Sequence, residues 1–482
     1  MALVEVPDAL APALEAVLAH IDEFTSRGEA GEVVDFRSDE RVLMERMAAL
    51  EGCATGVMLS SLDPRSPRVR VGGKTYRRMN NPNCTASYFG LRSKFRVERG
   101  IYREEGVRNG PTIVPMELRA GVVDGQLTPA AAGGIATLGQ AMPSREASET
   151  SVRLGVLPYS RSEHFRAAVR VGKRWGELRE LYEEGLVEVM PLPDNVASVS
   201  VATDRASLPM REPREATERD IEKGVKNPVA VNLRMAFCGV LTLYDPDGNP
   251  LDCIRYAHVP TDGADDIRNA LTDDLGVLLK RRPDLKVVAL ADGAVDMQNL
   301  LDAVTEGRDV VATLVDFWHL LEKLASACEA VAESSANHIP RFRAMLLDDD
   351  DAIHQIADQL GAWAQRYAPV DGPNPGQLSA RPEGLHHAIT YLDNNAARMR
   401  YASVHRAGLP IGSGTVEATA KTIIGSRMRR PGCRWIEPGA QPILALRALA
   451  TSSVQRWQQV MEHIVASYTA HVTPLGAVGD AT

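Results

Sequence analysis

The nine residues KVVALADGA, from Lys286 to Ala294, read as a buried strand that ends at an acid followed by a glycine. A short apolar run of this kind is typical of a strand inside a helix-covered sheet. A helical pattern stands on either side of it, GADDIRNALTDDLGVLLKRR before and MQNLLDAV after, and a second apolar strand, VVATLVDF, follows. Upstream, NVASVSVATDRASLPM, VAVNLRMAFCGVLTLYD and IRYAHVPT read as three more strands. The order β-β-β-α-β-α-β predicts an α/β mixed sheet with helices on its faces.

Two acids stand at particular places on this sheet. Asp292 ends the strand VVALA, where an open sheet places its ligands, although Asp-Gly is also ordinary turn chemistry. Asp204 interrupts the first strand, and a carboxylate on a buried backbone needs a partner or a metal. Its rivals Asp245, Asp247 and Asp252 lie in or beside the turn DPDGNP and read as solvated.

A third acid follows a glycine-rich turn. In GLPIGSGTVEATAK, residues 408–421, Glu417 stands near the start of a small-residue helix. The run RMRRPGCRW, which begins at Arg427, contains no acid. The sequence therefore places a lone carboxylate between a tight turn and a basic segment.

The rest of the chain divides by texture. Residues 1–64 are helical in pattern, and residues 65–127 form a basic β-hairpin region about Gly72-Gly73. Residues 128–190 predict three helices, with Thr128, Ser144 and either Ser160 or Ser162 as N-caps. These three helices are interpreted either as a helix-turn-helix DNA-binding domain or as a plain bundle. The core then spans 191–320, an all-helical insertion 321–407, and a C-terminal core part 408–470.

Composition gives further bounds. The 482 residues carry a net charge of −9, which is unusual for a nucleic-acid binder. Between Arg65 and Arg103, however, eleven Lys and Arg face one acid, Glu98, so this run is either a solvated face or a phosphate-binding surface. The six cysteines form no CxxC pair, and neither a signal peptide nor a membrane span is read from the sequence. A reduced, cytoplasmic protein is expected.

Five ordered motifs carry a resemblance: LADGA, VDFWHLLEKL, YLDNNAARMRYA, GLPIGSGTVEATAK and RMRRPGCRWIEPGAQPILALRAL. With RVERGIYREEGVRNGPTIVPMELRAG and TPAAAGGIATLGQ upstream, residues 68–450 resemble bacterial insertion-sequence transposases of the Kra type, relatives of the Mutator-like group. The resemblance implies an RNase H-like core with a DDE triad, whose positions are occupied here by Asp204, Asp292 and Glu417. It also implies a D-x-x-H pair near the active site, Asp316 and His319, although His319 also reads as a helix-surface residue.

The implied function is Mg²⁺-dependent cleavage and strand transfer at transposon ends, with two Mg²⁺ (or Mn²⁺) ions held by the three carboxylates. A homodimer or higher oligomer on double-stranded DNA is expected, nucleoid-associated when active. Two alternatives stay open: a structure-specific nuclease on the same core, and a catalytically silent DNA-binding derivative. The DNA-contacting residues expected from the basic segments are Arg68, Arg70, Lys74, Arg77, Arg78, Lys94, Arg96, Arg166, Arg170, Lys173, Lys421, Arg427, Arg429 and Arg430.

Overall fold

A computed structural model describes residues 6–80, 84–366 and 383–476. Its internal contacts divide the chain into two compact units. Unit 1 contains Met1–Arg179 and Gln458–Thr482, and unit 2 contains Glu180–Trp457. The architecture is mixed α/β, as predicted, with several sheets and many helices. In the part of the chain that is described, none of the helices combines the length and apolarity needed to cross a membrane.

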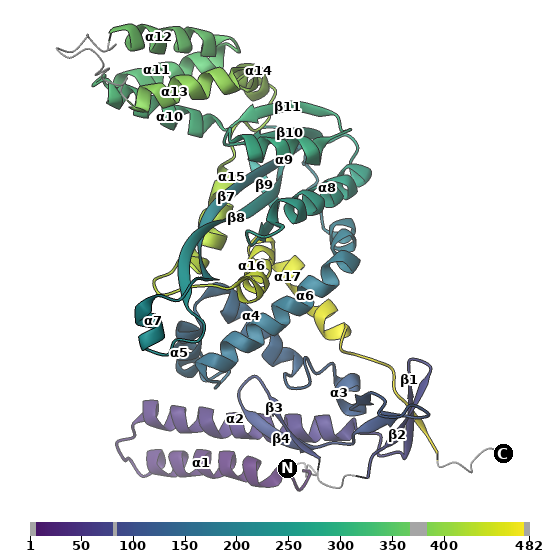
Figure 1. Ribbon diagram of the computed structural model, residues 1–482. Helices are drawn as coiled ribbons and strands as arrows, with labels where there is room; N and C mark the ends of the chain where they lie inside the picture. Colours follow the sequence, from purple (N-terminus) through teal and green to yellow (C-terminus); the bar gives the residue numbers. More distant parts are fainter. Residues whose placement is uncertain (1–5, 81–83, 367–382, 477–482) are drawn as a thin grey trace. The chain divides into compact units, whose positions relative to one another are not determined.

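The central feature of unit 2 is a five-stranded mixed sheet (Figure 1). Its strand order is β11-β10-β7-β8-β9. The first three strands in sequence pair antiparallel, whereas β10 is parallel to β7 and β11 is parallel to β10. The elements are β7 (Ser198–Pro213), β8 (Val229–Tyr244), β9 (Pro250–His258), α8 (Gly263–Arg281), β10 (Lys286–Ala291), α9 (Val295–Thr305) and β11 (Val310–Val315). The order predicted from the sequence is found, with one addition, the short helix α7 (Glu218–Glu222) between β7 and β8.

Helices cover the two faces of the sheet differently. On one face, Val201, Leu241 and Leu243 pack with Leu271 and Leu301 of α8 and α9 in a single buried cluster. The other face carries the C-terminal elements α15 (Gly414–Thr419), the π-helix η2 (Ala420–Met428) and α16 (Glu437–Ser452). Asp204 lies on this second face, because it alternates with the core-facing residues of β7.

The described residues between β11 and α15 are mainly helical, in the region where the sequence predicts a helical insertion (321–407). Tyr391 donates a hydrogen bond to the carbonyl of Asp292 (2.7 Å), and Tyr401 donates one to the carbonyl of Val315 (3.0 Å). The insertion therefore docks two tyrosine hydroxyls onto the ends of β10 and β11. The predicted break around Pro373 lies outside the described residues. The helices are α10 (Phe317–Ala330), α11 (Ser335–Asp348), α12 (Ala352–Arg366), α13 (Glu383–Asn395), the 3₁₀ helix η1 (Ala396–Arg398) and α14 (Tyr401–Arg406).

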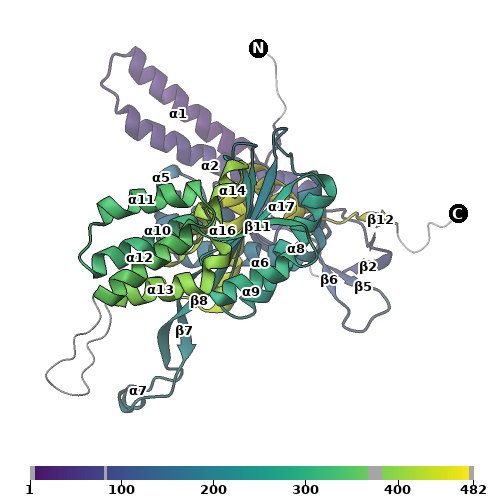
Figure 2. The same ribbon diagram turned by 90° about the horizontal axis from the view of Figure 1, so that it is seen from above.

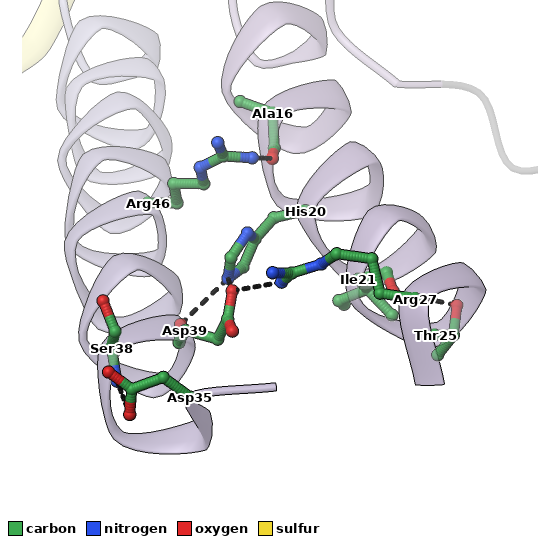
Figure 3. A network of polar contacts seen from close by, with 9 residues as sticks. All are labelled: Ala16, His20, Ile21, Thr25, Arg27, Asp35, Ser38, Asp39 and Arg46. Carbon is green, nitrogen blue, oxygen red and sulfur yellow. Dashed lines mark hydrogen bonds and ion pairs between the residues drawn. The ribbon is translucent and has the colours of Figure 1, made fainter. Parts of the chain in front are cut away.

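Unit 1 begins with a hairpin of two helices, α1 (Ala11–Glu29) and α2 (Phe36–Ser61). Polar contacts join the pair (Figure 3). Nε2 of His20 lies 2.9 Å from the carbonyl oxygen of Asp39, and Arg27 donates to the Asp39 carboxylate at 2.6 Å. Asp35 caps α2 by accepting from the amide of Ser38.

The sheet of unit 1 has the order β12-β1-β2-β5-β6. The predicted hairpin about Gly72 and Gly73 is confirmed, with positive φ at both glycines. The edge strand β12 comes from the C-terminus, so residues from Gln458 onward belong to unit 1 and not to the core segment 408–470 expected from the sequence. The elements are β1 (Arg68–Val71), β2 (Lys74–Arg78), β5 (Tyr102–Glu104), β6 (Thr112–Ile113), β12 (Thr473–Leu475), the separate pair β3 (Thr85–Phe89) and β4 (Lys94–Glu98), and α3 (Pro115–Ala120).

Three helices follow in the predicted region 128–190: α4 (Pro129–Ala141), α5 (Ser144–Leu154) and α6 (Arg161–Val189), and α17 (Val454–Ala466) crosses back into unit 1. Thr128 is the N-cap of α4, as predicted. Ser160 forms a capping box with Glu163 at the start of α6, which decides between Ser160 and Ser162. The expectation for Ser144 is wrong: Pro143 occupies the N-cap of α5, and Ser144 is already inside the helix.

Candidate functional site

Three aspartates continue the register of three adjacent strands, Asp204 within β7 and Asp292 and Asp316 one residue past the ends of β10 and β11. Strands β10 and β7 are parallel and pair Leu290 with Ala202. Two residues further along each chain segment, the same register brings Asp292 beside Asp204. Strands β10 and β11 pair Ala291 with Val315, so Asp292 and Asp316 come next on each. Because the three strands are parallel, the acids meet where β10 and β11 end. Open α/β sheets bind their ligands at the carboxyl ends of such strands.

The electrostatics of Asp204 show which charges surround it. Burial raises the pKa of the Asp204 carboxyl, and a hydrogen bond from the backbone amide of Arg205 (2.6 Å) lowers it. The negative charges of Asp292 and Glu417 raise this pKa further, whereas His319 lowers it. Two other candidate acids and the candidate histidine are therefore close enough to act on Asp204.

Glu417 reaches this neighbourhood on α15, which packs on β7 and β8. The hydroxyls of Tyr244 and Thr415 lie 3.4 Å apart, and Arg255 of β9 donates to the hydroxyl of Thr419 at 3.0 Å. The Glu417 side chain is half exposed and forms an ion pair with Lys421 at 2.5 Å. This contact raises the pKa of Lys421 and occupies a residue expected to contact DNA.

Asp316 is buried, 5% exposed, and connects two elements. One of its carboxylate oxygens accepts from the backbone amide of His319 (2.7 Å) and thereby caps α10. The other oxygen accepts from both the amide and the hydroxyl of Ser413, the hydroxyl at 2.5 Å. Ser413 is the N-cap of α15, so Asp316 ties the start of the helix that carries Glu417 to the end of β11.

The glycine turn packs tightly against the same place. The amide of Phe317 donates to the carbonyl of Ile411 at 3.2 Å. A Cβ atom on Gly412 would lie 2.8 Å from the ring of Trp318, so any larger residue would have to displace this exposed ring. The sequence drew attention to the glycines and to Glu417 but missed Ser413. Its signal was the position of a serine directly before the helix, where N-caps are found.

Asp245, the rival of Asp204, lies in the turn between β8 and β9. Its carboxylate accepts from the amides of Asp247 (3.0 Å) and Asn249 (2.8 Å) and from the Asn249 side chain (3.0 Å). These bonds lower the pKa of Asp245, the Asn249 side chain contributing most. Asp245 therefore has the structural role of a turn residue, while Asp204 faces the other acids.

The described residues contain no group of three or more His, Cys, Asp or Glu side chains already arranged to hold a metal ion. The donor set nevertheless suits Mg²⁺, because Asp204, Asp292 and Glu417 offer only hard carboxylate oxygens. The carboxylates of Asp292 and Glu417 add negative charge around the buried Asp204, which a cation would compensate. Glu417 is paired with Lys421 through Oε1, so a metal ion at this site would compete with that ion pair.

The excess of positive charge between Arg65 and Arg103 is smaller in the folded structure than in the sequence. Four of its cations pair with acids that flank the run: Arg68 with Glu105 (2.8 Å), Lys74 with Glu104 (3.0 Å), Arg78 with Asp63 (3.6 Å) and Arg99 with Glu117. Arg70, Arg77 and Arg96 remain exposed on β1, β2 and β4. Arg77 stands directly across from Arg68 on one side and from Arg103 on the other, which forms a row of three arginines on one face of the sheet.

The remaining basic candidates divide by exposure. Arg166 and Lys173 are exposed on α6, whereas Arg170 pairs with Asp124 at 2.5 Å. Lys94 lies 4.8 Å from the ring centre of Phe89. Arg429 is exposed and Arg430 is partly buried. Arg427 is only 2% exposed, with its guanidinium over Trp435, so it packs in the interior and does not offer the surface position expected of a DNA contact.

Comparison with known proteins does not show a family for this chain. No protein-family model matches the sequence, and no curated protein matches it. Among solved structures, the chain is similar to the Drosophila P element transposase strand transfer complex, with 10% sequence identity, over 70% of this chain and 83% of that chain, at a TM-score of 0.24. A similarity at this TM-score carries no argument about function.

Proposed function

We propose that this chain is a DDE transposase of a bacterial insertion sequence, with an RNase H-like core in unit 2. The observation that carries the proposal is the level arrangement of Asp204 and Asp292 on adjacent strands, with the charge of Glu417 acting on Asp204 from α15. These three residues match the triad positions that the sequence motifs imply. The mixed sheet, with its antiparallel hairpins followed by two parallel strands, supports the core assignment.

In this proposal Asp204, Asp292 and Glu417 would hold two Mg²⁺ ions. When bound, such ions stabilise the charge on the attacking and leaving oxygens of a phosphoryl transfer. Asp204 and Asp292 would hold the ions from fixed positions on the sheet, while Glu417 would exchange its contact with Lys421 for a contact with the ions. Asp316 has a different role, because both of its oxygens already accept hydrogen bonds that position α10 and α15.

DNA contact is proposed for the exposed cations of unit 1, Arg70, Arg77 and Arg96 on the sheets and Arg166 and Lys173 on α6. Contacts to phosphates are independent of sequence and weaken steeply with salt. Because β12 pairs with β1, a fragment that ends at residue 190 lacks an edge strand of this sheet. Binding is therefore best tested in the full chain, with Arg70, Arg77 and Arg96 replaced by glutamine. Glu98→Gln, on the β3–β4 hairpin that also carries Arg96, is the control.

The decisive experiment incubates the full chain with the DNA that flanks its coding sequence, a target plasmid and Mg²⁺. Joined products support a transposase, cut products without joining indicate a nuclease, and neither indicates a binding protein. Asp204→Asn, Asp292→Asn and Glu417→Gln should each abolish cleavage and joining while end binding survives, and their losses should not add. Asp284→Asn serves as the control, because the Asp284 side chain is exposed and pairs with Arg282. Retention of cleavage in all three site variants would contradict the proposal.

A further inference from the structure

The apolar side of β8 continues past the helices that cover it. Leu241 and Leu243 are 1% and 2% exposed and belong to the core beneath α8 and α9. Phe237, at the same side of the strand, packs on Gly263 at the start of α8. Towards the start of β8 the alternation continues without cover. Its members, here named the β8 stripe, are Val229, Val231, Leu233 and Met235, with exposed fractions of 37%, 43%, 67% and 39%.

The backbone edge beside this stripe is also open. Strand β7 pairs with β8 along its whole length, from Pro213 with Val229 to Ser198 with Tyr244. On the opposite side, β9 pairs only with residues 237–244 of β8. Among the described strands, none pairs with the outer edge of residues 229–236. Figure 2 shows this part of the hairpin leading away from the sheet of unit 2 towards α7 (Glu218–Glu222). An open apolar edge strand is a template for pairing with another strand.

The charge of the hairpin end favours a protein as the partner. Residues 211–226 contain five basic and five acidic side chains, so this segment has no net charge. Arg214 pairs with Asp220 at 2.6 Å, and Arg234 pairs with Glu212 at 2.6 Å. A surface that binds nucleic acid needs an excess of positive charge, which is missing here. The chain as a whole carries −9, which opposes the approach of two copies elsewhere, whereas the neutral hairpin end does not.

We propose that the β8 stripe pairs edge to edge with the same stripe of a second copy of this chain. An antiparallel pairing about Asn232 places Val231 opposite Leu233 of the second copy and Val229 opposite Met235. Arg234 then stands opposite Ala230 and meets no second arginine. The strand is thus complementary to itself, as a two-fold interface requires. Apolar cross-strand pairs stabilise a sheet only modestly, so the contact is weak and depends on protein concentration.

This proposal does not depend on transposition, and it is tested without DNA. A photo-cross-linking amino acid replaces Leu233 in one full-length variant and Asn232 in another, in an equal mixture of isotopically light and heavy protein. Leu181 on α6, which is 77% exposed, provides the control position. Circular dichroism verifies that each variant is folded.

Edge pairing predicts cross-links between light and heavy copies from positions 233 and 232, both within the peptide that contains residues 229–235. The yield should rise with protein concentration and fall several-fold when Val231→Lys is added, while position 181 gives little. Cross-links within one copy would show that another part of the same chain covers the stripe and would overturn the proposal. Cross-links from 233 alone, or from neither position, would equally exclude edge pairing.

Discussion

The buried carboxylate of Asp316 accepts two hydrogen bonds from Ser413, one from its backbone amide and one from its hydroxyl. These two residues are 97 positions apart, and the helical insertion separates them. The contact fixes the first turn of α15, and Glu417 lies on that short helix. The position of the candidate catalytic glutamate is therefore set from the end of β11.

Removing the Ser413 hydroxyl should loosen this connection. A hydrogen bond to a charged group contributes about 1.5–3 kcal/mol to stability, so Ser413→Ala should lower the free energy of unfolding of unit 2 by roughly that amount. Cleavage should fall further than stability predicts, and Ser413→Thr should restore part of it. Urea unfolding and the cleavage assay measure the two effects. Ser426→Ala is the control, because that hydroxyl bonds to a carbonyl of its own helix. Equal cleavage in Ser413→Ala and wild type would count against the positioning role.

The glycines of the turn offer a matched pair. Gly412→Ala brings a Cβ to 2.8 Å from the Trp318 ring, whereas a Cβ on Gly414 meets nothing within 4 Å. We expect Gly412→Ala to displace the ring, change the tryptophan fluorescence and reduce cleavage several-fold. Gly414→Ala should leave cleavage unchanged and stabilise α15 slightly, by about 0.5–1 kcal/mol. The idea fails when both variants behave alike.

Asp204 and Asp245 are separated by one comparison. Asp204→Asn should reduce Mg²⁺- or Mn²⁺-dependent cleavage by at least about a thousandfold, since residues that act as a unit fail together. Asp245→Asn should keep near-normal cleavage, because its side chain holds a turn. The reverse result would mean that the first carboxylate of the site lies in the β8–β9 turn.

A buried ionic network in unit 2 makes a strong stability prediction. Arg456 is paired with Glu183 (3.1 Å) and Asp274 (3.5 Å), and all three side chains are largely buried. Arg456→Met leaves both carboxylates without this cation, and breaking a buried pair costs about 3–5 kcal/mol. Arg366→Met removes an exposed partner of Glu333 and should cost under about 1 kcal/mol. Denaturant unfolding of both variants checks this difference, which a similar loss in the two would contradict.

His164 should make the stability of unit 1 sensitive to pH. It is 2% exposed, its Nε2 lies 3.2 Å from the carbonyl of Leu157, and burial lowers the pKa of its ring. The unfolded chain therefore takes up a proton below about pH 6.5 that the folded chain resists, so the free energy of unfolding falls as the pH drops through that range. Between about pH 7.5 and pH 5.5, His164→Gln should lose less stability than wild type. His387 is exposed, so His387→Gln should show the same pH dependence of unfolding as wild type. The prediction is wrong when the free energy of unfolding of His164→Gln falls with pH as steeply as that of wild type.

The sequence alone determined the order of elements in unit 2, because apolar runs and helical periodicity are local properties of the chain. It also singled out Asp292 and Glu417, since each stands directly beside a glycine turn. The excess of positive charge between Arg65 and Arg103 was visible too, but its partners Asp63, Glu104 and Glu105 lie outside the run or at its edge.

Only the tertiary structure decided which residues meet. The register between β7, β10 and β11 places Asp204, Asp292 and Asp316 at one level, and no local pattern encodes a register between strands so far apart in sequence. The burial of Arg427 and the pairing of β12 with β1 likewise depend on contacts across long distances in the chain. The hydrogen bond between Ser413 and Asp316 could not be predicted from the sequence around either residue. It forms because the chain comes back to the sheet after the helical insertion, which is a long-range property of the fold.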